Sequence, residues 1–303
     1  MKQFYFEESV ERLIRISKEK PLLPETYVPW ADEPKDDTLF MPEKLVSLEG
    51  HPLWQKLSRE QQIELGRLEV IQVMYSYAWS ETLACYFFQR HLLGLDPDSV
   101  EYRFLLREII EESRHQEMFG MAIRKLDRKP VKPTGLHRLF AYLTVRWFPD
   151  SWMFISVLAI EHMADTYAHH MRRDPGVFSV IRKCSQLHHI EEGRHIQYAE
   201  WWLKRFTDSA GFFKITLLSL ITLANILFMR SFYVQRAFFK ELGTGDSDTL
   251  YRAARTHYRK KFAGLAAEES VRFVNSFGGF NFITRPLWSF FLLNPSASNQ
   301  NPK

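Results

Sequence analysis

Two short stretches of the chain share a pattern of residues that bind metal ions. Glu111-Glu112-Ser113-Arg114-His115 recurs as Glu191-Glu192-Gly193-Arg194-His195, and four of the five positions are identical. Each copy contains Glu-x-x-His, and positions i and i+3 share one face of a helix. Each copy therefore directs one carboxylate and one imidazole the same way. Two helices of this kind that face each other form the core of a carboxylate-bridged dinuclear metal site.

Two single glutamates complete the pattern. A dinuclear site in a helical bundle also takes one Glu from each of two further helices. Glu81 and Glu161 fit this role, because each lies on an apolar face of a predicted helix with no Lys or Arg three or four residues away. A buried carboxylate is costly unless it is paired or bound to metal. The alternative for each is a partner on another helix.

His188 is a further candidate ligand. It lies four residues before Glu192, so His188, Glu192 and His195 share one helix face at positions i, i+4 and i+7. From the residues alone it is a ligand, a hydrogen-bond partner of a ligand, or a core histidine. The remaining central histidines fall off the metal faces and are predicted not to bind: His91, His162, His169, His170 and His189.

Several residues near the candidate ligands are predicted to support the metal site. Asp165, one turn after Glu161, is a candidate to orient a ligand histidine through its second nitrogen. Arg114 and Arg194 point off the metal face and are expected to form ion pairs. Gly193 costs about 1 kcal/mol within a helix, which indicates either a close approach or bulge near the metals, or crowding between helices. Cys85 and Cys184 are expected to line the cavity wall as small apolar groups. Aromatic side chains are expected to form a wall around the site or to be plain core, namely Tyr77, Phe88, Phe119 and Phe154.

The charges of the predicted set favour a metal pair. Four carboxylates balance two divalent cations, whereas four buried carboxylates without metal would repel one another and take up protons. Metal binding should therefore stabilise the fold. Carboxylate with imidazole suits iron or manganese better than a structural zinc site, which would favour Cys.

The composition is that of an ordinary globular protein. The chain has 303 residues, 46% hydrophobic and 25% charged, with a net charge of +4 that argues against a nucleic-acid partner. Two cysteines are too few for a disulfide framework and favour a reducing compartment. The N-terminal stretch has early acids and lacks the apolar segment of a signal peptide. A cytoplasmic protein is expected.

Hydrophobic periodicity predicts an all-α fold around a four-helix bundle. Proline-rich residues 20–55 predict an extended arm. The four bundle helices are predicted at 61–93, 98–126, 151–172 and 177–206, followed by hydrophobic helices at 210–242 and 247–274. We expect one domain over 1–303, with an N-terminal arm (1–58), a metal-binding bundle (61–206) and accessory hydrophobic helices (210–290).

Residues 212–229 are nearly all apolar. Eighteen residues is the lower limit for a membrane-spanning helix. A helix buried in the domain or in a dimer interface is the favoured interpretation, because the preceding bundle helix needs a packing partner. A membrane-facing surface or a lipid-substrate surface is the alternative.

At these residues the chain resembles the AurF-like p-aminobenzoate N-oxygenases, a family of non-haem diiron oxygenases. The resemblance covers roughly residues 60–205. It includes the four-Glu pattern and a third histidine four residues before the last Glu-x-x-His, here His188. The resemblance implies a ferritin-like fold and seven ligands to two iron ions, with a manganese–iron pair as an alternative: Glu81, Glu112, His115, Glu161, His188, Glu192 and His195.

The resemblance also implies an activity. Such an enzyme activates O2 and transfers oxygen to a small apolar or aromatic substrate, in this family typically at an amine nitrogen. It needs an external electron donor or reductase, and family members are commonly homodimers. Three alternatives remain: hydroxylation, desaturation or C–C cleavage of a lipid-like substrate at the same cofactor, iron binding without substrate oxidation, and a purely structural helical protein.

Overall fold

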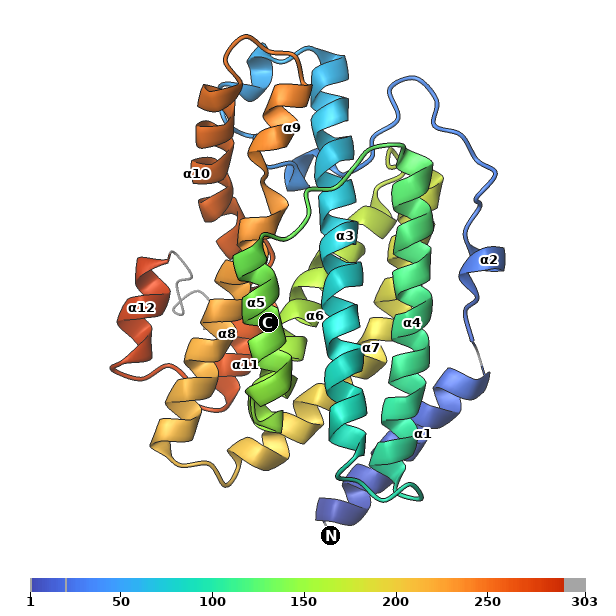
Figure 1. The fold of residues 1–303 in the computed structure, drawn as a ribbon, viewed down its shortest axis with the longest axis vertical. Helices are drawn as coiled ribbons and strands as arrows, with labels where there is room; N and C mark the ends of the chain where they lie inside the picture. The colour runs from blue at the N-terminus through green and yellow to red at the C-terminus, as the bar shows by residue number, and fades with distance from the viewer. Residues whose placement is uncertain (1, 20, 292–303) are drawn as a thin grey trace, which may run out of the picture.

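The chain folds into helices throughout the part that the structure describes (Figure 1). The structure is a computed structural model that describes residues 2–19 and 21–291. Within these ranges the one β-bridge is isolated and joins Leu39 to Val177. The predicted all-α, ferritin-like class is confirmed.

Four long helices form the central bundle (Figure 1). Their bounds lie within a few residues of the predicted ones: α3 Arg59–Leu92, α4 Val100–Leu126, α6 Asp150–Arg173 and α7 Ser179–Thr207. α3 packs closely on α4, and α6 packs closely on α7. α4 also packs on α7, and α3 on α6. Each helix thus contributes one face to a shared interior.

Local sequence signals set the ends of these helices. Ser58 accepts a hydrogen bond from the Gln61 backbone N–H, and the Gln61 side chain bonds back to Ser58, which forms a capping box at the start of α3. Ser99 caps α4 in the same way, through the Tyr102 N–H. α4 ends at Asp127, whose φ of +52° is left-handed.

An N-terminal helix, α1 (Lys2–Glu19), occupies part of the segment 1–58 that was expected to be an N-terminal arm. Phe6, Val10, Leu13 and Ile14 are buried and pack α1 against α4 and α7. The next segment is extended as predicted, apart from three single turns: α2 Pro24–Tyr27, η1 Glu43–Leu45 and η2 Trp54–Lys56. The expectation of an arm was therefore wrong for residues 2–19, which form a packed layer of the fold.

A second unpredicted helix, α5 (Gly135–Trp147), follows α4 and precedes α6 along the chain. Thr134 and His137 form its capping box. Its outer face carries exposed apolar side chains, among them Leu136, Tyr142 and Trp147. The prolines before it obscured the helical pattern.

The C-terminal helices are shorter than predicted. The two predicted helices at 210–242 and 247–274 are each broken, and one more helix follows: α8 Phe212–Tyr233, α9 Arg236–Glu241, α10 Ser247–Leu265, α11 Glu268–Ser276 and α12 Thr284–Phe290. The breaks fall at the buried residues Val234, Ala266 and Ala267. The chain turns at these residues and continues to pack on the rest of the protein. This is an effect of tertiary packing, which local periodicity does not reveal.

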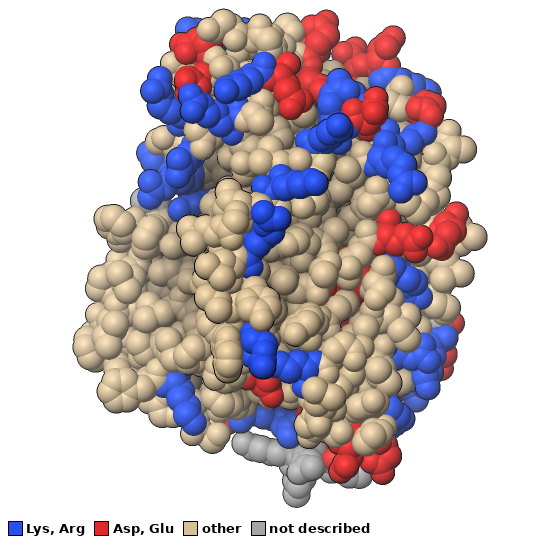
Figure 2. Space-filling view, viewed as in Figure 1, with Lys and Arg blue, Asp and Glu red and all other residues tan. Residues whose placement is uncertain are grey.

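The apolar helix α8 packs on α6 and α3. Among the described residues, one helical stretch, Phe212–Glu241, is long and apolar enough to cross a membrane, and 44% of its most apolar window is buried. A core helix of a globular protein passes the same test. In Figure 2 the Lys, Arg, Asp and Glu side chains gather at the top, along the right edge and at the lower end, whereas the left side of the view, where α8 and α12 lie, is mostly uncharged.

Candidate metal centre

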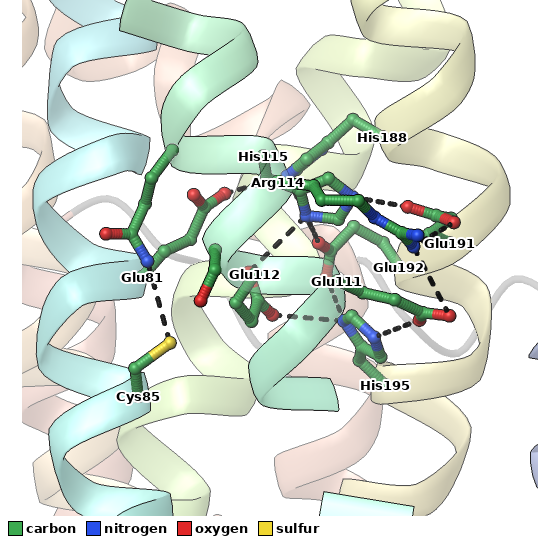
Figure 3. A network of polar contacts seen from close by, with 12 residues as sticks. Glu81, Cys85, Glu111, Glu112, Arg114, His115, His188, Glu191, Glu192 and His195 are labelled. Carbon is green, nitrogen blue, oxygen red and sulfur yellow. Dashed lines mark hydrogen bonds and ion pairs between the residues drawn. The ribbon is translucent and has the colours of Figure 1, made fainter. Parts of the chain in front are cut away.

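The four bundle helices bring all seven predicted ligands together inside the protein. Figure 3 labels each of them except Glu161. None of the seven residues is more than 8% exposed. They come from α3 (Glu81), α4 (Glu112, His115), α6 (Glu161) and α7 (His188, Glu192, His195). The arrangement meets the geometric requirement for a shared metal centre.

One residue that the sequence analysis missed belongs to the same cluster. Glu108 of α4 is 2% exposed. It forms a group with Glu112, Glu161 and His195 in which one candidate ligand atom from each residue lies within 4.8 Å of the others. A second group of the same kind consists of Glu81, His115, His188 and Glu192. The centre therefore offers two neighbouring positions for an ion.

The two ion positions have similar sets of ligands when α4 is matched with α7 and α3 with α6. α4 and α7 each carry three candidate ligands at i, i+4 and i+7, namely Glu108, Glu112 and His115 on α4 and His188, Glu192 and His195 on α7. α3 and α6 add one Glu each. In this match Glu108 is the counterpart of His188. The spacing that singled out His188 was thus also present before Glu112, and it would have identified Glu108.

The first Glu of each pentapeptide bonds the histidine of the other copy. His115 Nε2 lies 2.8 Å from Glu191 Oε2, and His195 Nε2 lies 2.9 Å from Glu111 Oε2. A carboxylate accepts, so each Nε2 carries the proton. Nδ1 of each ring faces the cluster, and the Nδ1 of His195 is 3.0 Å from Glu112 Oε1. Such a carboxylate–imidazole pair fixes the ring of a metal-binding histidine.

The arginines of the pentapeptides complete these crossed contacts (Figure 3). Arg114 Nη2 donates to Glu191 Oε1 at 3.2 Å, and Arg194 Nη2 donates to Glu111 Oε1 at 2.9 Å. The predicted ion pairs are therefore present, and Arg194 is buried. Ser17 of α1 donates a further hydrogen bond to Glu111 at 2.5 Å. Four of the five pentapeptide positions thus have a role in or beside the centre.

Aromatic rings hold His188 in place. Its ring stacks on Tyr77 with centroids 5.8 Å apart and contacts Phe119 at 5.0 Å. Its Nε2 lies 3.2 Å from Glu81 Oε1 and 3.1 Å from Glu192 Oε1. The Nδ1 atom has no hydrogen-bond partner among the described residues. On the Nδ1 side of this imidazole, ring packing therefore takes the place of the carboxylate that holds His115 and His195.

Burial and mutual repulsion make the centre hold protons when no metal is bound. Burial, with repulsion from nearby carboxylates, raises the pKa of Glu81, Glu108 and Glu161 well above the usual value. Burial opposes the charged form of His115 and His195, but hydrogen bonds and neighbouring carboxylates outweigh it, and the pKa of both rings is raised well above 6.5. Two cations would take the place of these protons.

The residues fit a pair of iron or manganese ions. Several buried carboxylate oxygens of the cluster lack a hydrogen-bond partner within the described ranges, namely Oε2 of Glu81, Glu108, Glu161 and Glu192. Buried polar atoms are rarely left unpaired, and a bound cation would satisfy them. Neither group contains Cys, and mixed carboxylate and imidazole donors suit iron or manganese.

A small cavity adjoins the centre between α3 and α6. Its volume is about 30 Å³, and its walls combine carboxylates of the cluster with small, aliphatic and aromatic side chains, namely Tyr77, Ser80, Ala84, Val157, Ile160 and Ala164. That is room for about two water molecules. A larger molecule needs lining side chains to move.

The structure decides several expectations for the residues near the centre. Asp165 bonds His189, which lies outside the cluster, so its predicted role in orienting a ligand histidine was wrong. Phe88 and Phe154 contact each other in the core and do not line the cavity.

Neither cysteine lines the cavity. Cys184 is core, and Cys85 accepts a hydrogen bond from Gln116. Gly193 is exposed, and no atom lies within 4 Å of where a Cβ would be, so neither crowding nor close approach explains it.

Comparison with known proteins decides the family. The sequence matches the family described as P-aminobenzoate N-oxygenase AurF over residues 5–278, nearly the whole chain. The chain belongs to the AurF family. The AurF match extends well beyond the residues 60–205 that carried the resemblance in the sequence, and it takes in α1 and most of the C-terminal helices.

Three curated relatives of this AurF-family chain are uncharacterized proteins, one from Mycobacterium bovis and two from strains of Mycobacterium tuberculosis. Each is 28% identical over 214 residues, which is 66% of this chain and 63% of the relative. The alignment thus covers less than two thirds of the relatives' length. The buried Glu and His groups of this AurF-family chain are able to bind metal.

Proposed function

We propose that this protein is an O2-dependent oxygenase with two iron ions held by Glu81, Glu112, His115, Glu161, His188, Glu192 and His195, and that it oxygenates an amine nitrogen. The observation that carries the proposal is the pair of adjoining, fully buried carboxylate and imidazole groups in an AurF-family chain. When bound, the ions supply the electrons that reduce O2, which amino-acid side chains do not provide.

The surrounding residues have defined tasks in this proposal. Glu111 and Glu191 hold the imidazoles of His195 and His115 with Nδ1 turned inward. Arg114 and Arg194 neutralise these two carboxylates, so the carboxylates of the centre itself remain for the metal. The aliphatic walls formed by Val157, Ile160 and Ala164 exclude water from the reacting side.

The cavity supports an uncharged substrate. Among the described residues, the cavity walls contain no Lys or Arg. An anionic group on a substrate would therefore lose its hydration without gaining a counter-charge. We propose an apolar or aromatic amine without a carboxylate as the substrate class. The re-reduction of iron would come from an external electron donor.

Two further proposals concern assembly and location. A homodimer is proposed because the faces of α5 and α12 expose apolar side chains such as Trp147 and Phe290. Size-exclusion chromatography with light scattering tests it. A cytoplasmic location is proposed from the cysteine content.

Product analysis after loading with iron tests the function. The protein is loaded with Fe(II) without oxygen, supplied with reductant and ¹⁸O2, and given p-toluidine, p-aminobenzoate or a fatty acid in separate reactions. The proposal expects ¹⁸O on the nitrogen of p-toluidine and less product from p-aminobenzoate. Product from the fatty acid alone would support hydroxylation or desaturation instead. Bound iron without any product would favour iron binding alone, and no bound metal would contradict the whole assignment.

A further inference from the structure

We propose that Glu108 is an eighth protein ligand, which completes the ion position formed by Glu112, Glu161 and His195. This inference rests on the proposed function of the centre. It adds a residue to the seven that the repeat and the family pattern identify, and it makes the two positions chemically different from each other.

The first argument is the equivalence of Glu108 and His188. Each residue lies one helical turn before the Glu of a Glu-x-x-His, on α4 and α7 respectively. Positions i and i+4 share a helix face, so both side chains point at the centre. His188 joins the group of Glu81 and His115, and Glu108 joins the group of Glu161 and His195. The same spacing thus supplies one extra donor to each position.

The second argument is that Glu108 has no other partner that would justify its burial. It is 2% exposed, and its Oε2 has no hydrogen-bond partner within the described part of the chain. The nearby arginines, Arg114 and Arg194, are paired with Glu111 and Glu191 instead. A buried carboxylate oxygen without a donor is costly, and a cation bound beside Glu112 and His195 would remove that cost.

The third argument concerns charge. Four carboxylates neutralise two divalent ions, and the fifth leaves one excess negative charge. With two trivalent ions the fifth carboxylate instead reduces the excess positive charge. In a buried site with a low dielectric constant such differences are large. Glu108 should therefore stabilise the oxidised ion pair relative to the reduced pair, and its removal should raise the reduction potential.

Anaerobic titration with Co(II), which gives visible bands that depend on the ligands, tests this inference. Glu108→Gln removes the charge and keeps the shape. Glu69→Gln is the matched control, because Glu69 is 4% exposed but binds Ser47 outside the centre. Loss of a partner of a ligand already weakens metal binding about 10- to 100-fold. We expect one of the two ions to bind Glu108→Gln at least about 10-fold more weakly, and Glu69→Gln to bind as the wild type does.

A second variant covers the case in which Glu108→Gln does not fold. Glu108→His makes the α4 set identical in kind to that of α7, so it should bind two Co(II) ions with shifted bands. Wild-type affinity and an unchanged spectrum in either variant would show that Glu108 is not a ligand, while the proposed function would stand. If the wild-type protein bound no Co(II) or Fe(II), the proposed function would fail, and this inference with it.

Discussion

The first glutamate of each pentapeptide accepts a hydrogen bond from the histidine of the other pentapeptide. Glu111 bonds His195 and Glu191 bonds His115, and the two arginines pair in the same crossed fashion. This explains why the repeat includes Glu-Glu and Arg in addition to Glu-x-x-His. Hydrogen bonds and the charge of His195 lower the pKa of Glu111 to about 2 despite its burial. Glu111 is therefore a charged acceptor at neutral pH.

The crossed contacts lead to a prediction for metal affinity. Glu191→Gln keeps an oxygen that accepts from His115 but loses the charge that makes the imidazole a stronger donor to metal. We expect metal binding to weaken about 10-fold or more, measured by anaerobic titration with Co(II). Glu111→Gln should have a similar effect through His195. Wild-type metal affinity in both variants would show that the charges of Glu111 and Glu191 do not contribute to metal binding.

Glu69 provides a prediction about pH and stability. Burial raises its pKa from 4.5 to about 7, even though Ser47 donates two hydrogen bonds to it. Because the folded state binds this proton more tightly than the unfolded state, the contribution of Glu69 to stability is full below pH 4.5 and is lost as the pH rises through about 7. The total is on the order of 3 kcal/mol.

The measurement compares metal-free wild type with Glu69→Gln, because the rest of the protein titrates equally in both. Urea unfolding should give similar free energies of unfolding at pH 4. Above pH 7 the wild type should be less stable than the variant. A difference that does not change with pH would contradict the raised pKa.

At the scale of the helices, sequence reasoning succeeded where one face is apolar over many turns. α3, α4, α6 and α7 begin and end close to the predicted positions, because caps such as Ser58 and Ser99 agree with the periodicity. α5 was missed because the prolines before it suggested a loop, and α1 was missed because its residues were counted with the N-terminal arm. The breaks in the C-terminal helices depend on tertiary packing and have no local signal.

The same reasoning placed seven residues of the centre and overlooked one. Spacing was sufficient to identify Glu112, His115, Glu192 and His195, because the same pentapeptide occurs twice. Glu108 has that spacing too, but a single Glu on a helix with many charged residues does not stand out. The roles of Glu111 and Glu191 depend on contacts between helices that no single-helix pattern predicts.

α1 gives a prediction at this scale. Leu13 is 3% exposed and anchors α1 on the bundle, next to Ser17, which reaches Glu111. Leu13→Ala should cost about 2–5 kcal/mol of stability, measured by urea unfolding. Glu8→Ala on the exposed side of α1 is the control and should change stability little. Equal effects of the two substitutions would mean that α1 contributes little to the packed core.

For the whole molecule, the centre links metal binding to folding. Metal-free protein must bury several carboxylates whose pKa values are raised, and two cations remove that cost. Fe(II) or Co(II) at 100 times the dissociation constant should stabilise the protein by about 2.7 kcal/mol per site. Because metal competes with protons, the stabilisation should shrink as the pH falls. Thermal unfolding with metal and with EDTA at several pH values measures it, and an unchanged Tm would contradict the link.

The two sides of the centre differ in how firmly they are joined. Charged hydrogen bonds connect α4 to α7 through Glu111, Glu191 and both arginines. On the opposite side, the cavity separates α3 from α6 with short or aliphatic side chains that interlock weakly, such as Ser80, Ala84 and Val157. A passage for a bulky molecule would therefore open by separation of α3 from α6, while the hydrogen bonds between α4 and α7 keep the imidazoles in position.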